Sequence, residues 1–97
     1  MTNNVFSALG HPLRRQVMDL LRKGPRTSGE LSDAFEASWP TVSRHLSVLK
    51  DADLITAERQ GTSIIYRANT SVIEDAAAAL LAMIGRDNGD DDDDDMK

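Results

Sequence analysis

Apolar residues in the first half of the chain recur with the 3.6-residue period of an α-helix, and the breaks between them mark separate helices. Residues 3–9 form one short apolar segment, which ends at Gly10. Pro12 suits the first turn of a second helix, and Gly24 with Pro25 ends it. The inward stripe of this second helix is Leu13, Val17, Leu20 and Leu21.

A capping box predicts the start of a third helix. Thr27 and Glu30 stand three residues apart, so each side chain can accept a hydrogen bond from the other residue's backbone N–H. The helix is expected to end near Ala37. The side chains expected to be buried from it are Leu31, Ala34 and Phe35.

The fourth helix is expected over residues 39–52, with Ser38 as its N-cap and Trp39 and Pro40 in its first turn. Its two faces differ in character. The inward face carries Val42, Leu46 and Leu49, and the outward face carries Thr41, Ser43, Arg44, Ser47 and Lys50.

After Asp53 the period changes from that of a helix to that of a strand. Residues 54–58 and 63–67 are rich in β-branched and apolar side chains, and the polar residues 59–62 between them include one glycine. This pattern predicts a β-hairpin with a basic tip.

A fifth helix follows the hairpin. Ser71 and Glu74 have the spacing of a second capping box, and apolar residues continue to Ile84, where Gly85 ends the helix. Residues 86–97 have almost no apolar content, so we expect a disordered acidic tail after a single domain of residues 1–85.

Four helices, a hairpin and a fifth helix, with a short turn between the third and fourth, form the order of a winged helix-turn-helix. The predicted fold is therefore mainly α with a small β-hairpin. In this arrangement the fourth helix enters the major groove of DNA, because a helix about 10 to 12 Å across fits a groove about 12 Å wide.

The overall charge of −5 does not oppose this interpretation. Residues 86–97 carry two of the eleven basic side chains and seven of the sixteen acidic ones, so the other 85 residues have nine of each. Phosphate contacts are local, and a basic face matters more than net charge. The run 90–95 is either a solvated tail or a segment that competes with DNA for the basic face.

The chain contains no cysteine, which excludes disulfides and thiolate metal sites. No segment approaches the roughly 20 apolar residues of a membrane span, and residues 1–10 lack the features of a signal peptide. We expect a cytoplasmic protein without membrane insertion. An enzyme is not expected, because two separated histidines do not assemble a nucleophile, a base and an orienting group.

DNA contacts are expected from two segments. In the fourth helix small hydroxyl side chains allow close approach, while Arg44 can match guanine or bind a phosphate. In the hairpin the basic tip can reach a minor groove or a phosphate. The expected DNA-binding residues are Ser38, Thr41, Ser43, Arg44, His45, Ser47, Lys50, Arg59, Gln60 and Thr62.

The apolar stripe of the fifth helix is wider than the rest of so small a domain can cover. Together with the first helix it predicts the seam of a homodimer, which would suit a two-fold symmetric operator. The alternative is that the same residues form core within one chain. The expected dimerisation residues are Val5, Phe6, Leu9, Val72, Ile73, Ala76, Leu80, Leu81 and Ile84.

Three segments together resemble the ArsR/SmtB family of small repressors. Residues 6–15 resemble the family's opening motif, and residues 38–50 resemble its recognition-helix motif S-x-P-x-V-S-x-H-L-x-x-L. Residues 51–67 resemble its wing, although Asp53 stands where the family usually has glycine. The resemblance implies a sequence-specific repressor that binds double-stranded DNA as a homodimer on an inverted-repeat operator.

Many members of that family sense metals through cysteines in the third helix or through histidine and carboxylates in the last. Here residues 30–33 contain no cysteine, and the last helix offers only the adjacent carboxylates Glu74 and Asp75, which point about 100° apart. We therefore expect no metal and no cofactor. The resemblance is to the metal-independent, SdpR-like branch, which implies a protein partner that relieves repression.

Several alternatives remain open at the level of sequence. Trp39 either packs against the third helix or touches DNA, and His45 either touches a phosphate or is a partly buried histidine bonded to backbone. His11 is expected to cap the second helix, and Arg14 and Arg15 are expected to be salt-bridged or packed. The rival functions are a winged-helix protein-interaction module and a regulator that responds to a small molecule bound between the first and last helices.

Overall fold

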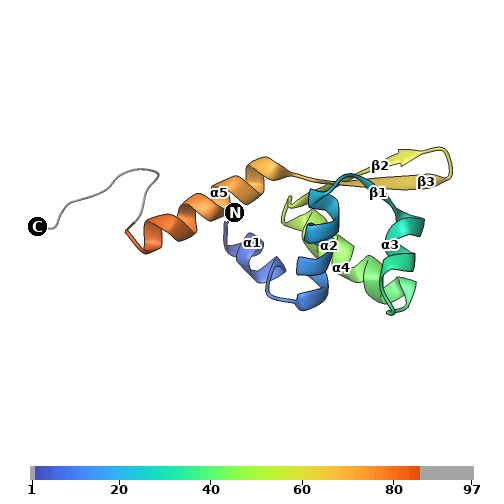
Figure 1. The fold of residues 1–97 in the computed structure, drawn as a ribbon, viewed down its shortest axis with the longest axis horizontal. Coiled ribbons are helices and arrows are strands. Elements are labelled where there is room, and N and C mark those ends of the chain that lie inside the picture. Colours follow the sequence, from blue (N-terminus) through green and yellow to red (C-terminus); the bar gives the residue numbers. More distant parts are fainter. Residues whose placement is uncertain (1, 86–97) are drawn as a thin grey trace, which may run out of the picture.

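The computed structural model describes residues 2–85 and has the predicted order of helices with one addition (Figure 1). The expected tail of residues 86–97 lies outside the described residues. The elements are α1 (Thr2–Ala8), α2 (Pro12–Arg22), β1 (Arg26–Thr27), α3 (Ser28–Ala34), α4 (Trp39–Asp51), β2 (Ile55–Gln60), β3 (Ser63–Ala68) and α5 (Thr70–Met83).

The added element is β1, which turns the predicted hairpin into a three-stranded antiparallel sheet of order β1-β3-β2. Arg26 pairs with Tyr66, and Thr27 pairs with Ile65. A strand of two residues is too short to show an alternating pattern in the sequence, so the prediction of a lone hairpin was incomplete. Because α3 starts directly after β1, this pairing fixes α3 to the sheet.

The hairpin turn is tighter than expected. β2 extends through Gln60 and β3 begins at Ser63, so only Gly61 and Thr62 form the loop. Gly61 has φ 62°, and a glycine with positive φ at the first loop position is typical of a type II′ turn. Arg59 and Gln60 therefore lie on a strand, and not in a loop as the sequence suggested.

The core lies between α2, α3, α4 and the start of β2. The largest fully buried side chains are Val17, Leu31, Val42, Leu49, Leu54 and Ile55. Burying each of them stabilises the fold by about 1.5 to 3 kcal/mol. The prediction for Ala34 was wrong, because α3 ends there and its methyl group is exposed. Phe35, as C-cap residue, is half-buried.

The second predicted capping box does not form. The N-cap of α5 is Asn69 in an extended conformation, without a side-chain cap bond, and Ser71 is an exposed residue inside the first turn. The backbone N–H of Asn69 donates to the carbonyl of Leu54 at 2.9 Å. This bond holds Asn69 next to the residue that precedes β2, and the helix begins two residues earlier than the sequence indicated.

α5 packs against α1 and lies on the side of the molecule opposite the hairpin (Figure 1). The hairpin extends from one side of the α2–α4 body, and α5 extends from the other (Figure 1). Within residues 2–85, no helix has the length and apolar character needed to cross a bilayer.

Candidate nucleic-acid interface

α4 presents the two faces that its sequence predicts. Val42, Leu46 and Leu49 are buried against the rest of the chain, which fixes the orientation of the helix. On the opposite side Arg44, Ser47 and Lys50 are exposed, while Thr41 and Ser43 are half-buried. The helix therefore offers a continuous polar ridge to solvent.

The first turn of α4 joins two of the expected contact residues to each other. Ser38 is the N-cap residue, as predicted, but its hydroxyl makes no cap bond to the backbone. It donates instead to the Thr41 hydroxyl at 3.2 Å. Both side chains are thus held at the end of the helix that would meet base edges first.

His45 is held by Arg14, an interaction that the sequence did not indicate. Arg14 Nη1 lies 2.9 Å from His45 Nδ1, and the same guanidinium donates to the carbonyls of Ala8 and Ser7 at the end of α1. Because a guanidinium can only donate, Nδ1 accepts and the imidazole proton lies on Nε2. His45 is partly buried, as one alternative held, but the partner of its Nδ1 is the Arg14 side chain and not the backbone.

Burial lowers the pKa of His45, and the neighbouring His11, Arg14 and Arg44 lower it further. The rings of His11 and His45 lie 4.3 Å apart and are tilted by 42°. The arrangement favours a neutral imidazole in the middle of cationic and ionisable neighbours.

Arg15 and His11, at the start of α2, also make contacts that stabilise the fold. Arg15 Nη1 donates to the Leu9 carbonyl at 2.8 Å, so Arg14 and Arg15 both bond the end of α1 and neither forms a salt bridge within residues 2–85. His11 caps α2 as predicted, since its Nδ1 accepts from the backbone N–H of Leu13 at 3.1 Å.

The tip of the hairpin is exposed and polar. Arg59, Gln60 and Thr62 are all open to solvent. Farther from the tip, Arg67 and Glu58 form an exposed ion pair at 2.8 Å. In the part of the chain that the structure describes, Arg59 has no acidic partner, so its charge is free to bind an anion.

Trp39, the first residue of α4, lines a cavity that α4 shares with the hairpin. It is 36% exposed and lines an open cavity of about 330 Å³. The cavity is also lined by Arg59 and Thr62 of the hairpin and by Ser28 and Ser32 of α3. Neither α3 serine was among the expected contact residues, because nothing in the local pattern of α3 places them beside the hairpin.

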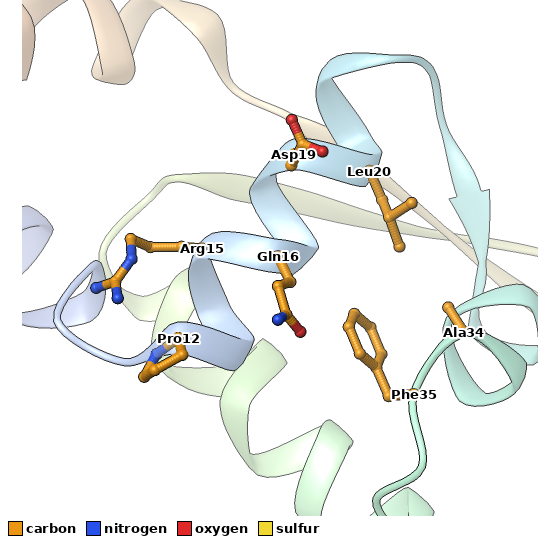
Figure 2. A pocket seen from close by; sticks show the side chains of 7 residues that line it. All are labelled: Pro12, Arg15, Gln16, Asp19, Leu20, Ala34 and Phe35. Carbon is orange, nitrogen blue, oxygen red and sulfur yellow. The ribbon is translucent and has the colours of Figure 1, made fainter.

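A larger cavity, of about 600 Å³, opens on the opposite side of α3, between α2 and the turn into α4. Figure 2 shows Gln16, Leu20 and Phe35 pointing into it, while Arg15 and Asp19 point away. Its one carboxylate, Asp19, bonds Arg22 at 2.9 Å, and this bond and charge lower the Asp19 pKa. Among the lining residues, the three that point inward in Figure 2 supply one amide and two apolar side chains.

The expected dimerisation residues fall into three groups. Val5 and Ala76 are only 2% and 4% exposed, so they belong to the core of the single chain. Phe6, Leu9, Val72 and Ile73 pack on that core and are partly buried. The exposed group lies at the end of α5 and consists of Leu80, Leu81 and Ile84, together with Met83, which was not among the expected dimerisation residues.

Comparison with known proteins gives consistent matches. Residues 11–57 match the sequence model described as "Bacterial regulatory protein, arsR family". The chain is 41% identical over 88 residues to the transcriptional repressor SdpR of Bacillus subtilis (strain 168), covering 91% of this chain and 98% of that protein. It is 35% identical over 83 residues to the HTH-type transcriptional repressor SmtB of Mycobacterium tuberculosis (strain ATCC 25618 / H37Rv), covering 86% of this chain and 62% of that protein.

Solved structures share the fold as well. The crystal structure of an ArsR family transcriptional regulator superposes with a TM-score of 0.77 at 31% identity, covering 86% of this chain and 84% of that one. NolR from Sinorhizobium fredii gives a TM-score of 0.67 at 28% identity, covering 86% of this chain and 83% of that one.

Proposed function

The chain belongs to the ArsR family of bacterial regulatory proteins, and from that premise we propose that it represses transcription by binding DNA as a homodimer. The family is one of DNA-binding transcriptional regulators and not of enzymes. The relatives named above are themselves called transcriptional repressors.

One observation carries the proposal: α4 is anchored by its apolar side and free on its polar side. A helix held in this way can enter the major groove without disturbing the core. Arg44 is the exposed side chain with the geometry to bind guanine O6 and N7 together. We therefore assign base reading to Arg44, with the Ser38–Thr41 hydroxyl pair and Ser43 beside it.

The remaining contacts are assigned to the DNA backbone. Lys50 at the end of α4 and Arg59 on the hairpin are exposed cations, and cation–phosphate contacts supply most of the affinity of such proteins. His45 Nε2, Ser47, Gln60 and Thr62 can donate further hydrogen bonds. This division predicts that specificity and affinity reside in different residues.

The exposed end of α5 supports the dimer part of the proposal. Four large apolar side chains are exposed near one another: Leu80, Leu81, Met83 and Ile84. A domain this small buries only a limited share of its apolar surface, so such exposure favours a partner. Pairing of α1 and α5 with the same elements of a second copy would cover them. Two copies of α4 would then face successive major grooves about 34 to 36 Å apart, which requires an inverted-repeat operator.

Selection of bound sequences from a random DNA pool tests the proposal directly. We expect enrichment of an inverted repeat whose half-sites are separated by about one helical turn. Failure to enrich any sequence, with no gel shift on the protein's own promoter, would indicate a protein-interaction module.

An Arg44→Ala variant tests the base-reading assignment on the selected operator. We expect a loss of about 1 to 3 kcal/mol in binding free energy, together with relaxed specificity at one operator position in each half-site. Lys50→Ala is the matched control and should weaken all sequences alike. A uniform loss from Arg44→Ala would reassign that residue to phosphate binding.

A second candidate function is a response to a small molecule. A cavity of about 690 Å³ lies between α2, the end of β3 and the start of α5, with Met18, Leu21 and Ile73 in its lining. Its volume is in the range of small-molecule sites. A thermal-shift screen that raises Tm and weakens operator binding with the same compound would support it.

Two further parts of the proposal come from the family resemblance. A repressor works where its operator lies, so we infer a cytoplasmic location. We also infer a protein partner that relieves repression. Capture of that partner by the tagged full chain, followed by loss of the gel shift when the purified partner is added, would test this part.

A further inference from the structure

The open cavity beside Trp39 is built from three elements that are distant in sequence. Ser28, Gly29 and Ser32 come from α3, Trp39 is the first residue of α4, and Arg59, Thr62 and Ile64 come from the hairpin. α3 lies alongside the sheet next to the hairpin (Figure 1). The cavity of about 330 Å³ thus separates the reading helix from the wing.

The chemistry of the lining suits a sugar–phosphate chain. Three hydroxyl groups and the backbone of a glycine can approach phosphate oxygens closely, and Arg59 supplies a positive charge with no acidic partner among the described residues. No carboxylate is among the lining side chains. The Trp39 ring provides an apolar surface of the kind that packs against a deoxyribose.

The geometry of duplex DNA places such a chain at this position. If α4 lies in a major groove and the hairpin reaches the adjacent minor groove, the two grooves are separated by one sugar–phosphate strand. That strand must pass between α4 and the hairpin. The cavity beside Trp39 is the hollow between these two elements.

We propose that this cavity binds one sugar–phosphate strand of the operator, with Ser28, Ser32 and Arg59 on a phosphate and Trp39 against the adjoining sugar. The proposal rests on the proposed function and adds Ser28, Ser32 and Trp39 to the DNA interface. It also assigns DNA contacts to α3, since the α3 serines would bond the DNA strand that passes between α4 and the hairpin.

Trp39 is the single tryptophan of the chain, so its fluorescence reports on this cavity alone. Titration of the full-length protein with the selected operator should change the emission intensity or wavelength of Trp39, with saturation at the same DNA concentration as the gel shift. A saturated gel shift with unchanged emission would overturn the proposal and leave the repressor assignment intact. Absence of any DNA binding would overturn both.

Matched variants test the phosphate contacts. Arg59→Ala should lower the slope of log K against log salt concentration by about 1, and the nearby Arg67→Ala, whose guanidinium is paired with Glu58, should not. Ser32→Ala should weaken operator and nonspecific DNA alike by about three- to ten-fold, as expected for one lost hydrogen bond. Ser71→Ala, an exposed hydroxyl on α5, is its control.

The variants have outcomes that separate DNA from another occupant. Wild-type affinity and salt slope in both Arg59→Ala and Ser32→Ala would show that no phosphate is bound in the cavity. A loss in Ser32→Ala confined to one operator position would show that α3 reads a base, which also contradicts the proposal. Circular dichroism of each variant confirms that it is folded before binding is measured.

Discussion

At the scale of single residues, Asp53 is the most instructive position. It is the one non-glycine residue with positive φ among residues 2–85, at 61°. It directly follows the C-cap residue Ala52 of α4, and its N–H donates to the Lys50 carbonyl at 2.9 Å. Asp53 stands where the related family usually has glycine, and the observed φ accounts for that preference, because the left-handed conformation favours glycine.

Asp53→Gly should stabilise the protein. Glycine removes the contact of Cβ with the backbone, which costs about 1 to 2 kcal/mol, while its own flexibility in the unfolded chain offsets part of the gain. We expect a net increase of about 0.5 to 1 kcal/mol in the free energy of unfolding, measured with urea. Asp51→Gly, in the last turn of α4, is the control and should destabilise. A loss of stability in Asp53→Gly would contradict this account.

His45 makes stability depend on pH at the mildly acidic end. Its folded-state pKa is lowered, chiefly by burial, so the unfolded chain binds the proton more readily than the folded chain. The contribution of His45 to the free energy of unfolding should therefore be fully present above about pH 6.5. It should decrease as the pH falls below that value.

The test is urea unfolding of the wild type and of His45→Gln between pH 5 and 8. This range extends about one and a half pH units on either side of the ordinary histidine pKa. The substituted amide would offer Arg14 an uncharged acceptor, so this contribution to the pH dependence should vanish in the variant. An identical decline in both proteins would assign the effect to other groups.

At the scale of elements, the two predicted capping boxes provide a natural pair. In α3 the Thr27 hydroxyl accepts from the Glu30 N–H at 3.0 Å, and the Glu30 carboxylate accepts from the Thr27 N–H at 2.8 Å. In α5 the same sequence spacing is present, but Ser71 lies within the helix and caps nothing.

Thr27→Ala should therefore cost about 0.5 to 2 kcal/mol in the free energy of unfolding, because a helix N–H loses its acceptor. Ser71→Ala should change stability by less than about 0.5 kcal/mol, as an exposed helical substitution does. Thermal and urea unfolding of both variants give the comparison. Equal losses from both would show that α5 is capped by Ser71 in solution.

At the scale of the whole molecule, the exposed end of α5 decides whether the repressor is a dimer. Leu80 lies four residues after the buried Ala76 and so continues its face of the helix, but it is 51% exposed. A seam between two copies would bury this side chain, which is exposed in the single chain.

Leu80→Asp should make the proposed dimer monomeric and abolish cooperative operator binding, since a carboxylate would be buried in an apolar seam. Sedimentation equilibrium and a gel shift on the selected operator measure the two effects. Ala78→Asp, which lies roughly on the opposite side of the helix, is the control and should remain dimeric. A dimeric Leu80→Asp protein that still binds its operator would contradict the proposed seam.

The sequence alone determined the features that depend on neighbours a few residues apart. The periodicity of Val42, Leu46 and Leu49 fixed the polar face of α4, because side chains three and four residues apart share one side of a helix. The His11 cap and the Thr27 capping box are likewise local arrangements and were predicted correctly, and the β2–β3 hairpin was predicted apart from its tighter turn.

The tertiary structure alone decided the features that join distant segments. Arg14 bonds His45 across 31 residues, and β1 pairs with β3 across about 40. Trp39 and Arg59 line one cavity only because α3 and the hairpin pack together. None of these contacts leaves a period in the sequence. They depend on how the buried faces of separate elements fit one another, and that fit also caused Asn69, bonded to Leu54, to replace Ser71 as the start of α5.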